Sequence, residues 1–413
     1  MEEAIAVKDP HLIAEPMQPI SPPRNSIRLG YIDGLRGVAI LLVLLTHTWI
    51  FAGAPALSFH IYGKAIVLAA IPAIGYVGVN LFLVLSGFCL AFPFLRDPTY
   101  RDRMTTTQFW MRRLRRIVPA YYISIVFVLL LYPGFGWLMK VLPIHRSGAT
   151  ALANAPPLAE VTPHLFLVHN LFPEHVSTIN GSYWSLALEF QLYFLFPLFL
   201  ELFFRWGPWR TVVLILIGQL TYRITLEQCL SSTTLDQYQF VLPKAVFGRM
   251  FDFAIGMTAA YVVIRRSLAQ DILTSRWGGF FGATLLILAF VLTSYLRVPA
   301  SLTDVVWAVG FAAVICYASC EKNACNRALS YRPLCALGVI SYSVYLIHQR
   351  IVERLGFVIR LYLKAGPAYI LLTLCIPLII GVGLLFFKLA EFPFLVPAVQ
   401  KAEKQELSAG SVA

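Results

Sequence analysis

The chain has 413 residues, of which 58% are hydrophobic and 13% are charged, about half the charged share of an ordinary soluble domain. A soluble globule of this length could not bury so many apolar side chains, and a disordered chain would not contain them, so both classes are excluded. The net charge of +12 does not indicate a nucleic-acid partner, because the basic residues lie in short loops beside apolar segments, where they set membrane topology. The composition predicts an all-α polytopic protein surrounded by membrane lipid.

Ten apolar stretches are candidates for membrane-spanning helices. They are expected at residues 38–55, 66–94, 117–139, 183–204, 210–222, 242–264, 279–296, 302–320, 334–356 and 367–389. With this topology roughly two thirds of the Lys and Arg residues fall on the side of the N-terminus, so the positive-inside rule places both termini in the cytosol. We expect a disordered cytosolic tail over residues 1–30, a membrane domain over residues 31–393 and a cytosolic tail over residues 394–413. The expected location is the inner membrane of a bacterial cell.

The first expected span carries two unusual polar residues, Arg36 and His47. They are eleven residues apart, about 1100° around a helix, so both lie on one face and about 16 Å apart along its axis. Arg36 is expected at the cytosolic edge and His47 near the midplane. A lone intramembrane His can simply bond a neighbouring helix, but its alignment with Arg36 favours a functional role, since an apolar bundle keeps the imidazole neutral and able to accept a proton.

Small residues and a cluster of arginines follow. The second span contains Gly78, Ser86 and Gly87, which are typical of close helix packing. Directly after it, the segment 109–119 places Arg112, Arg113, Arg115 and Arg116 beside Phe109 and Trp110. These arginines can be positive-inside anchors, or they can form a clamp for phosphate groups, and charge alone leaves both readings open.

The loop expected over about 140–182 contains four histidines, His145, His164, His169 and His175. No pair has the tight helical spacing of metal ligands, so ordinary loop histidines are favoured and no metal is predicted.

The fourth span begins with a polar stripe, because Ser185, Glu189 and Tyr193 step by four residues. A carboxylate inside the apolar zone must be protonated, paired or exposed to a wet cavity, which favours a function for Glu189. Arg249 and Asp252 in the sixth span are three apart and are expected to pair with each other as a structural ion pair.

The ninth span repeats this theme with Ser341, Tyr345 and His348 on one helix face. Counted from the helix ends, His348 and Glu189 fall at similar depths, a little outward of His47.

Five of these segments together resemble the acyltransferase-3 family of integral membrane O-acyltransferases, which modify carbohydrates and some glycosylated natural products. The matching pieces are Asp33–Gly37 with His47, Gly78–Phe82 with Ser86–Phe88, Arg113 and Arg116 with Ile117 and Pro119, Trp184–Leu186 with Glu189, and Ile340–Leu346 with His348. They occur in the family's order over residues 31–348, which is nearly the whole membrane domain.

The resemblance implies a bundle of about ten helices, a cytosolic acyl-coenzyme A donor, expected to be acetyl-coenzyme A, and a hydroxyl acceptor on a carbohydrate or lipid-linked glycan. It assigns Arg36 and His47 to the family's arginine–histidine pair, and Arg113 with Arg116 to its arginine pair. Two departures are expected: Asn80 occupies a position where the family often has an acid, and we expect no extracellular hydrolase-like domain after the last helix. The second departure suggests direct transfer to the final acceptor.

From these observations the chain is predicted to be a membrane O-acyltransferase. The expected catalytic residues are His47, Arg36 and Glu189; the donor is expected at Arg112, Arg113, Arg116 and Ser86; and Trp184, Tyr345 and His348, together with Glu189, are candidates for the acceptor side. His47 either takes the proton of the acceptor hydroxyl or first accepts the acyl group itself. The alternative is a proton-coupled transporter or flippase of a polysaccharide precursor, although arginines at one mouth and no internal repeat fit a cytosolic donor better.

Overall fold

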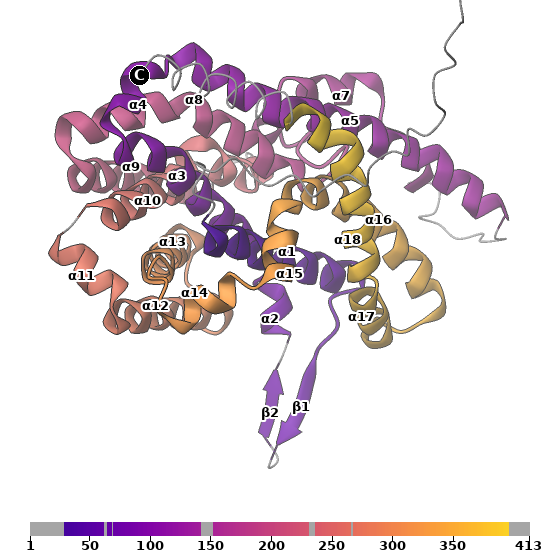
Figure 1. The fold of residues 1–413 in the computed structure, drawn as a ribbon. Coiled ribbons are helices and arrows are strands. Elements are labelled where there is room, and N and C mark those ends of the chain that lie inside the picture. The colour runs from indigo at the N-terminus through magenta and orange to yellow at the C-terminus, as the bar shows by residue number, and fades with distance from the viewer. Residues whose placement is uncertain are drawn as a thin grey trace, which may run out of the picture. The chain divides into compact units, whose positions relative to one another are not determined.

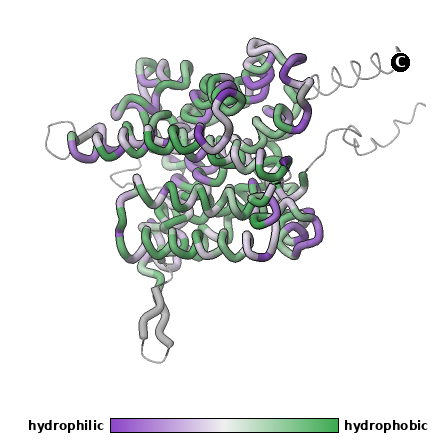
Figure 2. Tube along the Cα trace, turned by 90° about the vertical axis from the view of Figure 1, so that its left-hand side faces the viewer, coloured by the Kyte–Doolittle hydropathy of each residue, from purple (hydrophilic) through white to green (hydrophobic). Residues whose placement is uncertain are grey.

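The computed structural model describes residues 29–61, 64–67, 69–141, 152–230, 236–265 and 267–395. The expected tails lie outside these residues, except for their innermost ends at 29–30 and 394–395. Nearly all of the described chain is helical, and Figure 1 shows the helices packed against one another. Figure 2 shows hydrophobic residues along most helices and hydrophilic ones mainly at helix ends and in loops. The prediction of an all-α polytopic membrane protein is confirmed.

The long helices are α1 (Gly30–Phe51), α3 (Val77–Arg96), α5 (Thr106–Val141), α8 (Tyr183–Trp206), α9 (Pro208–Leu230), α10 (Val246–Ile264), α12 (Arg276–Ser294), α13 (Ala300–Ala318) and α16 (Ser341–Tyr362). The shorter ones are α2 (Ala70–Ala73), α4 (Pro98–Arg103), α7 (Leu158–Leu165), α11 (Leu268–Thr274), α14 (Ala324–Leu329), α15 (Arg332–Val339), α17 (Ala365–Leu374) and α18 (Ile376–Phe386). Three 3₁₀ turns, η1 (His169–Leu171), η2 (Asp236–Gln239) and η3 (Leu242–Lys244), and one π-helical turn, η4 (Phe387–Glu391), complete the helical part.

Eight helices in the described part of the chain are long and apolar enough to cross a membrane, or nine if the bent pair α15–α16 counts as one span. The expected fifth span corresponds to α9, which has 23 residues but does not meet these criteria. Polar residues lower the mean hydropathy of α9. Two of them, Gln219 and Arg223, are 0% and 4% exposed and point into the bundle. This helix therefore contributes polar groups to the interior.

The expected second span, 66–94, is wrong at its beginning. Strands β1 (Ser58–Ile61) and β2 (Lys64–Val67) form an antiparallel hairpin there, with Ser58 opposite Val67, and α3 begins only at Val77. The hairpin extends away from the helices (Figure 1). Its apolar β-branched residues could not be distinguished from a helix by hydrophobicity alone.

Three helix pairs, α3–α10, α1–α14 and α1–α15, are closely packed because glycines meet a facing backbone. A Cβ added at Gly87 in α3 would lie 1.9 Å from the carbonyl oxygen of Phe253 in α10, and one at Gly256 would lie 2.0 Å from that of Val84. In the same way, Gly34 and Gly338 bring α1 against α14 and α15. The expectation of close helix packing at Gly87 is confirmed, and these contacts hold α3 against α10 and α1 against α14 and α15.

The expected ninth span is broken. Helices α15 and α16 meet at Ile340 with a bend of 73°. Helix α15 packs against the beginning of α1, and α16 packs against the end of α1. Because α1 and α16 run parallel, His47 and His348 lie together.

Candidate active site

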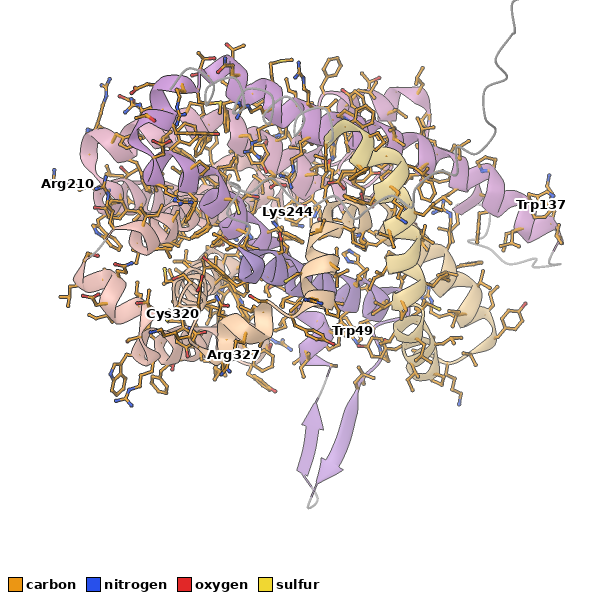
Figure 3. The ribbon with its side chains drawn as sticks, in the orientation of Figure 1. Trp49, Trp137, Arg210, Lys244, Cys320 and Arg327 are labelled. Atoms are coloured by element: carbon orange, nitrogen blue, oxygen red, sulfur yellow. The ribbon has the colours of Figure 1, made fainter. Side chains whose placement is uncertain are left out.

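A cavity of about 670 Å³ lies beside His47, within the size range of small-molecule sites. Its lining comes from the ends of α1 and α9, from the beginnings of α3, α8, α10 and α13, and from η2, η3 and α16, so these helix ends meet at one end of the bundle, called here the cavity end. The lining residues are Val43, Thr46, His47, Ile50, Tyr76, Val79, Asn80, Ser182, Trp184, Arg223, Leu226, Glu227, Gln239, Phe240, Pro243, Lys244, Arg249, Ala300, Asp304 and Tyr345. Figure 3 shows Lys244 amid the helices, whereas Arg210 and Trp137 lie at the edges of the view.

The hydrogen bonds of His47 define which of its nitrogens carries the proton. Its Nδ1 lies 2.9 Å from the carbonyl oxygen of Val43. A carbonyl can only accept, so the neutral ring carries its hydrogen on Nδ1 and its lone pair on Nε2. The ring lines the cavity, and Nε2 has no hydrogen-bond partner within the described residues. His47 thus offers a basic nitrogen at the cavity.

His348 contacts His47 directly. Its Nε2 lies 3.4 Å from Nδ1 of His47, the ring centroids are 4.8 Å apart, and its own Nδ1 lies 2.7 Å from the carbonyl oxygen of Tyr345. By the same argument, Nδ1 of His348 carries the hydrogen, and Nε2 presents a lone pair to Nδ1–H of His47. His348 was expected a little outward of His47, and this small offset in depth stays a prediction; the structure shows that the two rings are in contact.

Tyr345 and Trp184, the other candidates for the acceptor side, both line the cavity. The Tyr345 hydroxyl lies 2.5 Å from Oγ of Ser185 and donates to the carbonyl oxygen of Ser182 at 2.9 Å. Through these bonds the start of α8, which carries Trp184, is joined to α16. The expected polar stripe on α8 is therefore divided: Ser185 bonds to Tyr345 at the cavity end, and Glu189 bonds to Ser86 on the Arg36 side.

Glu189 lies on the Arg36 side of His47. Its carboxylate accepts hydrogen bonds from Oγ of Ser86 and, at 2.5 Å, from the Tyr193 hydroxyl. Along α3, Ser86 lies between Gly78, which packs on Ala39 of α1, and Cys89, which contacts Arg36. The expectation that Glu189 lies outward of His47 is thus wrong, because the depth of a residue in a bundle depends on how each helix is tilted and shifted.

Arg36 is half-buried in this deeper polar cluster. Its guanidinium pairs with Asp33 at 3.2 Å and donates to Sγ of Cys89 at 3.4 Å. Glu189 and Tyr193 are both within electrostatic reach. The structure therefore joins Arg36, Ser86 and Glu189 into one cluster, while His47 lies apart from it at the cavity end.

The expected arginine clamp is divided by exposure. Arg112 and Arg116 are exposed, and Arg112 contacts the Tyr100 hydroxyl at 3.4 Å. Arg113 turns inward, with its guanidinium 6.0 Å from the ring of Tyr193. Its Nε and the Nε1 of Trp110 are buried without a hydrogen-bond partner in the described part of the chain. Unsatisfied buried donors are costly, so this pair is suited to an acceptor-rich group such as phosphate.

A charged network at the cavity was not recognised from the sequence. Asp304 pairs with Arg223 at 2.6 Å and with Arg249 at 2.5 Å, and Asn80 donates to Asp304 at 3.1 Å and to Asp252 at 3.3 Å. The expected pair of Arg249 with Asp252 is present at 3.4 Å, but it is the longer of the two contacts that Arg249 makes. In the sequence, this network could have been inferred only from single charged residues, such as Arg223 and Asp304, that lie inside otherwise apolar stretches.

Glu391 was also missed, because the expected tenth span ended at residue 389. Its carboxylate accepts a hydrogen bond from Oγ of Ser343 at 2.6 Å, and the residue is 2% exposed. It thereby ties η4 to the beginning of α16, next to the break at Ile340. Arg36 and Arg116 are within its electrostatic reach.

Of the four loop histidines, His145 lies outside the described residues. His164 and His169 stack with ring centroids 3.8 Å apart and are both fully buried, while His175 accepts a bond from Nε2 of His164 on its carbonyl oxygen. Burial lowers the pKa of His164 to about 4 and that of His169 to about 2. These side chains thus belong to the packing of the loop.

Comparisons with known proteins agree with this architecture. The sequence model of the acyltransferase-3 family, described as an acyltransferase domain, matches residues 29–387. The chain is 28% identical over 339 residues to a peptidoglycan O-acetyltransferase, OatA, of Listeria monocytogenes, covering 78% of this chain and 49% of that protein. It is 26% identical over 341 residues to a protein named putative peptidoglycan O-acetyltransferase YrhL of Bacillus subtilis, covering 78% and 48%.

A third relative, the acyltransferase MdmB of Streptomyces mycarofaciens, is 30% identical over 183 residues, covering 44% of this chain and 41% of that protein. The chain spans about half the length of the curated relatives it matches, or less. No solved structure matches. Because the family model covers the helical part from α1 to the start of η4, which includes Arg36, His47, Glu189 and His348, the chain belongs to the acyltransferase-3 family.

Proposed function

We propose that this protein transfers an acyl group, most simply acetyl, from acyl-coenzyme A to a hydroxyl of a carbohydrate or glycosylated acceptor. Two of its relatives are named as peptidoglycan O-acetyltransferases and one as an acyltransferase, which supports this class of reaction. Membership of the family supports an acyl donor. The structural support is the separation of a basic nitrogen at a cavity from the arginines at the opposite end of the bundle.

The observation that carries the proposal is the state of His47. Its Nδ1–H is held by the Val43 carbonyl, so that Nε2 presents a lone pair where the ring lines the cavity. A general base must offer a lone pair to the hydroxyl it deprotonates. When Nε2 takes the proton, the charge on the ring is stabilised through Nδ1–H by the Val43 carbonyl and by Nε2 of His348.

The donor is proposed to enter from the other end. Arg113, with the exposed Arg112 and Arg116 around it, would hold the phosphates of coenzyme A, since guanidinium groups match phosphate oxygens. The thioester arm would then pass Arg36, Glu189 and Ser86 and bring its carbonyl carbon to His47. Roughly 16 Å of α1 separate Arg36 from His47, a distance that an extended chain rather than a compact group can cover.

In the reaction, the acceptor oxygen attacks the thioester carbonyl carbon while Nε2 of His47 takes its proton. The C–S bond then breaks, the thiolate of coenzyme A leaves, and His47 returns the proton to that sulfur. The products are the acceptor ester and free coenzyme A, and no further reactant is needed. If Nε2 attacks first, an acyl-histidine forms and is then cleaved by the acceptor; both routes use the same nitrogen.

The sidedness follows from charge. The arginine end carries the excess of Lys and Arg in the connecting loops, so the positive-inside rule supports a cytosolic location for the termini and for the donor. The cavity then opens toward the outer side of a bacterial inner membrane, where a carbohydrate acceptor would be presented.

The test is the release of free coenzyme A from acetyl-coenzyme A by protein in nanodiscs, with a mixture of cell-wall saccharides as acceptor. Replacing His47→Gln is expected to lower the rate about 10²- to 10⁴-fold, the range of general-base catalysis. His175→Gln, a histidine change in the loop, serves as the matched control and is expected to remain active.

Wild-type turnover by a folded His47→Gln variant would overturn the role of this residue. Transport of a saccharide across the bilayer without thioester cleavage would favour a carrier over an acyltransferase.

A further inference from the structure

We propose that the cavity beside His47 binds an uncharged sugar ring of the acceptor, and that the network of Asn80, Arg223, Arg249 and Asp304 recognises its hydroxyls. This inference rests on the proposed function, because it names the class of acceptor that the same site takes. It concerns residues to which no role in the reaction has been given above.

The network is buried and charged, and it lies on the cavity wall. Its four cavity-lining members, Asn80, Arg223, Arg249 and Asp304, are only 1% to 6% exposed. Replacing a buried ion network by apolar residues is often neutral or stabilising, so stability alone does not explain why these groups are present. Their place on the wall of a ligand-sized cavity indicates that they act on what enters it.

Part of the hydrogen-bonding capacity of the network is unused. The Nε atom of Arg223 is buried without a hydrogen-bond partner in the described part of the chain, whereas Nε of Arg249 faces Oδ2 of Asp252 at 3.4 Å, an ion contact that falls short of a hydrogen bond. A hydroxyl oxygen of a ligand could accept a hydrogen bond from an arginine N–H at this wall without adding charge to the network.

The charges of the network balance. Asp304 bridges the two arginines at 2.6 and 2.5 Å, and Asp252 lies 3.4 Å from Arg249. Two carboxylates therefore offset two guanidinium groups. An additional carboxylate or phosphate at this wall would be placed next to Asp304, which disfavours an anionic ring.

The remaining wall suits the apolar faces of a sugar. Tyr76, Trp184 and Phe240 line the cavity together with the network. A sugar ring has C–H faces that pack on aromatic rings and hydroxyls at its edge, and aromatic rings with planar guanidinium and carboxylate groups match both. Since His47 lines the same cavity, a hydroxyl of a ring bound there lies within the site of acyl transfer.

Lys244 supports an alternative occupant of the cavity, an anionic sugar. Its Nζ lies 2.8 Å from the ring centroid of Phe240 and 5.2 Å from that of Trp184, and no ion pair to it is found within the described residues. If Lys244 bound an anionic group, uronates would be preferred over neutral sugars.

The experiment measures binding of methyl glucoside and methyl glucuronide to the full chain in nanodiscs by saturation-transfer NMR and titration. The main variant is Asp304→Asn with Arg223→Gln, which keeps the net charge of the pair and removes its ion contact. It is expected to weaken binding of the glucoside at least tenfold, with acyl-coenzyme A binding changed less than twofold. Arg101→Gln with Glu201→Gln, an ion pair at 2.5 Å outside the cavity, is the matched control and is expected to bind like the wild type.

Tyr76→Leu provides a second variant if the first fails to fold, since Tyr76 is 40% exposed and its replacement leaves the network intact. It is expected to weaken glucoside binding several-fold. Unchanged glucoside affinity in either folded variant would overturn the inference, as would tighter binding of the glucuronide that is lost in Lys244→Met. If the wild type binds acyl-coenzyme A but no glucoside, the inference falls and the proposed function stands; if it binds the glucoside but never acyl-coenzyme A, the proposed function falls.

Discussion

The two histidines at the cavity end show how single hydrogen bonds define a chemical role. Val43 and Tyr345 each present a carbonyl to an Nδ1 atom, and these two contacts orient both rings and determine their neutral tautomers. His47 is thereby left with a lone pair at the cavity, and His348 with one directed at His47. We infer that His348 is a positioning residue that acts through His47.

Replacement of His348 should therefore affect turnover more than binding. In His348→Leu, Nδ1–H of His47 loses its second acceptor, and kcat is expected to fall roughly 10- to 100-fold with an unchanged KM for acyl-coenzyme A. In His348→Gln, the amide oxygen can replace Nε2 as acceptor, so most of the activity should return. Steady-state kinetics of both variants make the comparison; equal losses in Leu and Gln would indicate a packing role only.

At the scale of elements, the positions of the polar clusters depend on the close approach of α3 and α10. Gly87 of α3 and Gly256 of α10 form the contact between these helices; on α3, Asn80 precedes this contact and Ser86 lies within it, and Asn80 donates to Asp252 of α10 across the interface. If the helices were pushed apart, the charged network would lose its bridging amide. Glycine at these two positions is thus a condition for the site as well as for packing.

Gly87→Ala is expected to destabilise the protein by about 1–3 kcal/mol, because the new methyl group would meet the carbonyl oxygen of Phe253. The control is Gly134→Ala in α5, where a Cβ would have no neighbour within 4 Å, and no loss is expected there. Thermal unfolding in detergent provides the measurement. Equal unfolding temperatures for the two variants would contradict the close contact.

The loop element around His164 and His169 should lose stability as the pH falls. Both pKa values are lowered by burial, to about 4 and about 2, so between pH 6.5 and 4 the opened loop takes up protons that the folded loop does not. The free energy of opening should fall by roughly 1.4 kcal/mol per pH unit for each histidine. Above pH 6.5 it should be constant.

His169→Phe preserves a stacked ring and removes one titrating group, so about half of this pH dependence should disappear. Hydrogen exchange of residues 158–182 at pH 5 and pH 7.5, corrected for intrinsic rates, tests this. An unchanged pH dependence in the variant would exclude the stacked pair as its source.

At the scale of the whole molecule, the two polar regions lie at different depths along α1, with Arg36 near its beginning and His47 near its end. Such an arrangement lets donor and acceptor enter from opposite sides of a membrane. In oriented proteoliposomes, acyl-coenzyme A added on the side of the arginines should release coenzyme A on that same side, and the acyl group should appear on acceptor supplied on the other side. Release of coenzyme A on the acceptor side would contradict this arrangement.

Composition and motif spacing alone determined the membrane class, the helical architecture and the polar residues worth examining, because apolar stretches of span length and charges within them are visible in one dimension. Arg36, His47, Glu189 and His348 were found in this way. The contact between the two His rings, the place of Glu189 beside Ser86 and the partners of Asp304 were decided only in three dimensions. Each depends on helix tilt, on the break at Ile340 or on backbone contact at glycine, and such offsets between helices leave no periodic trace in the sequence.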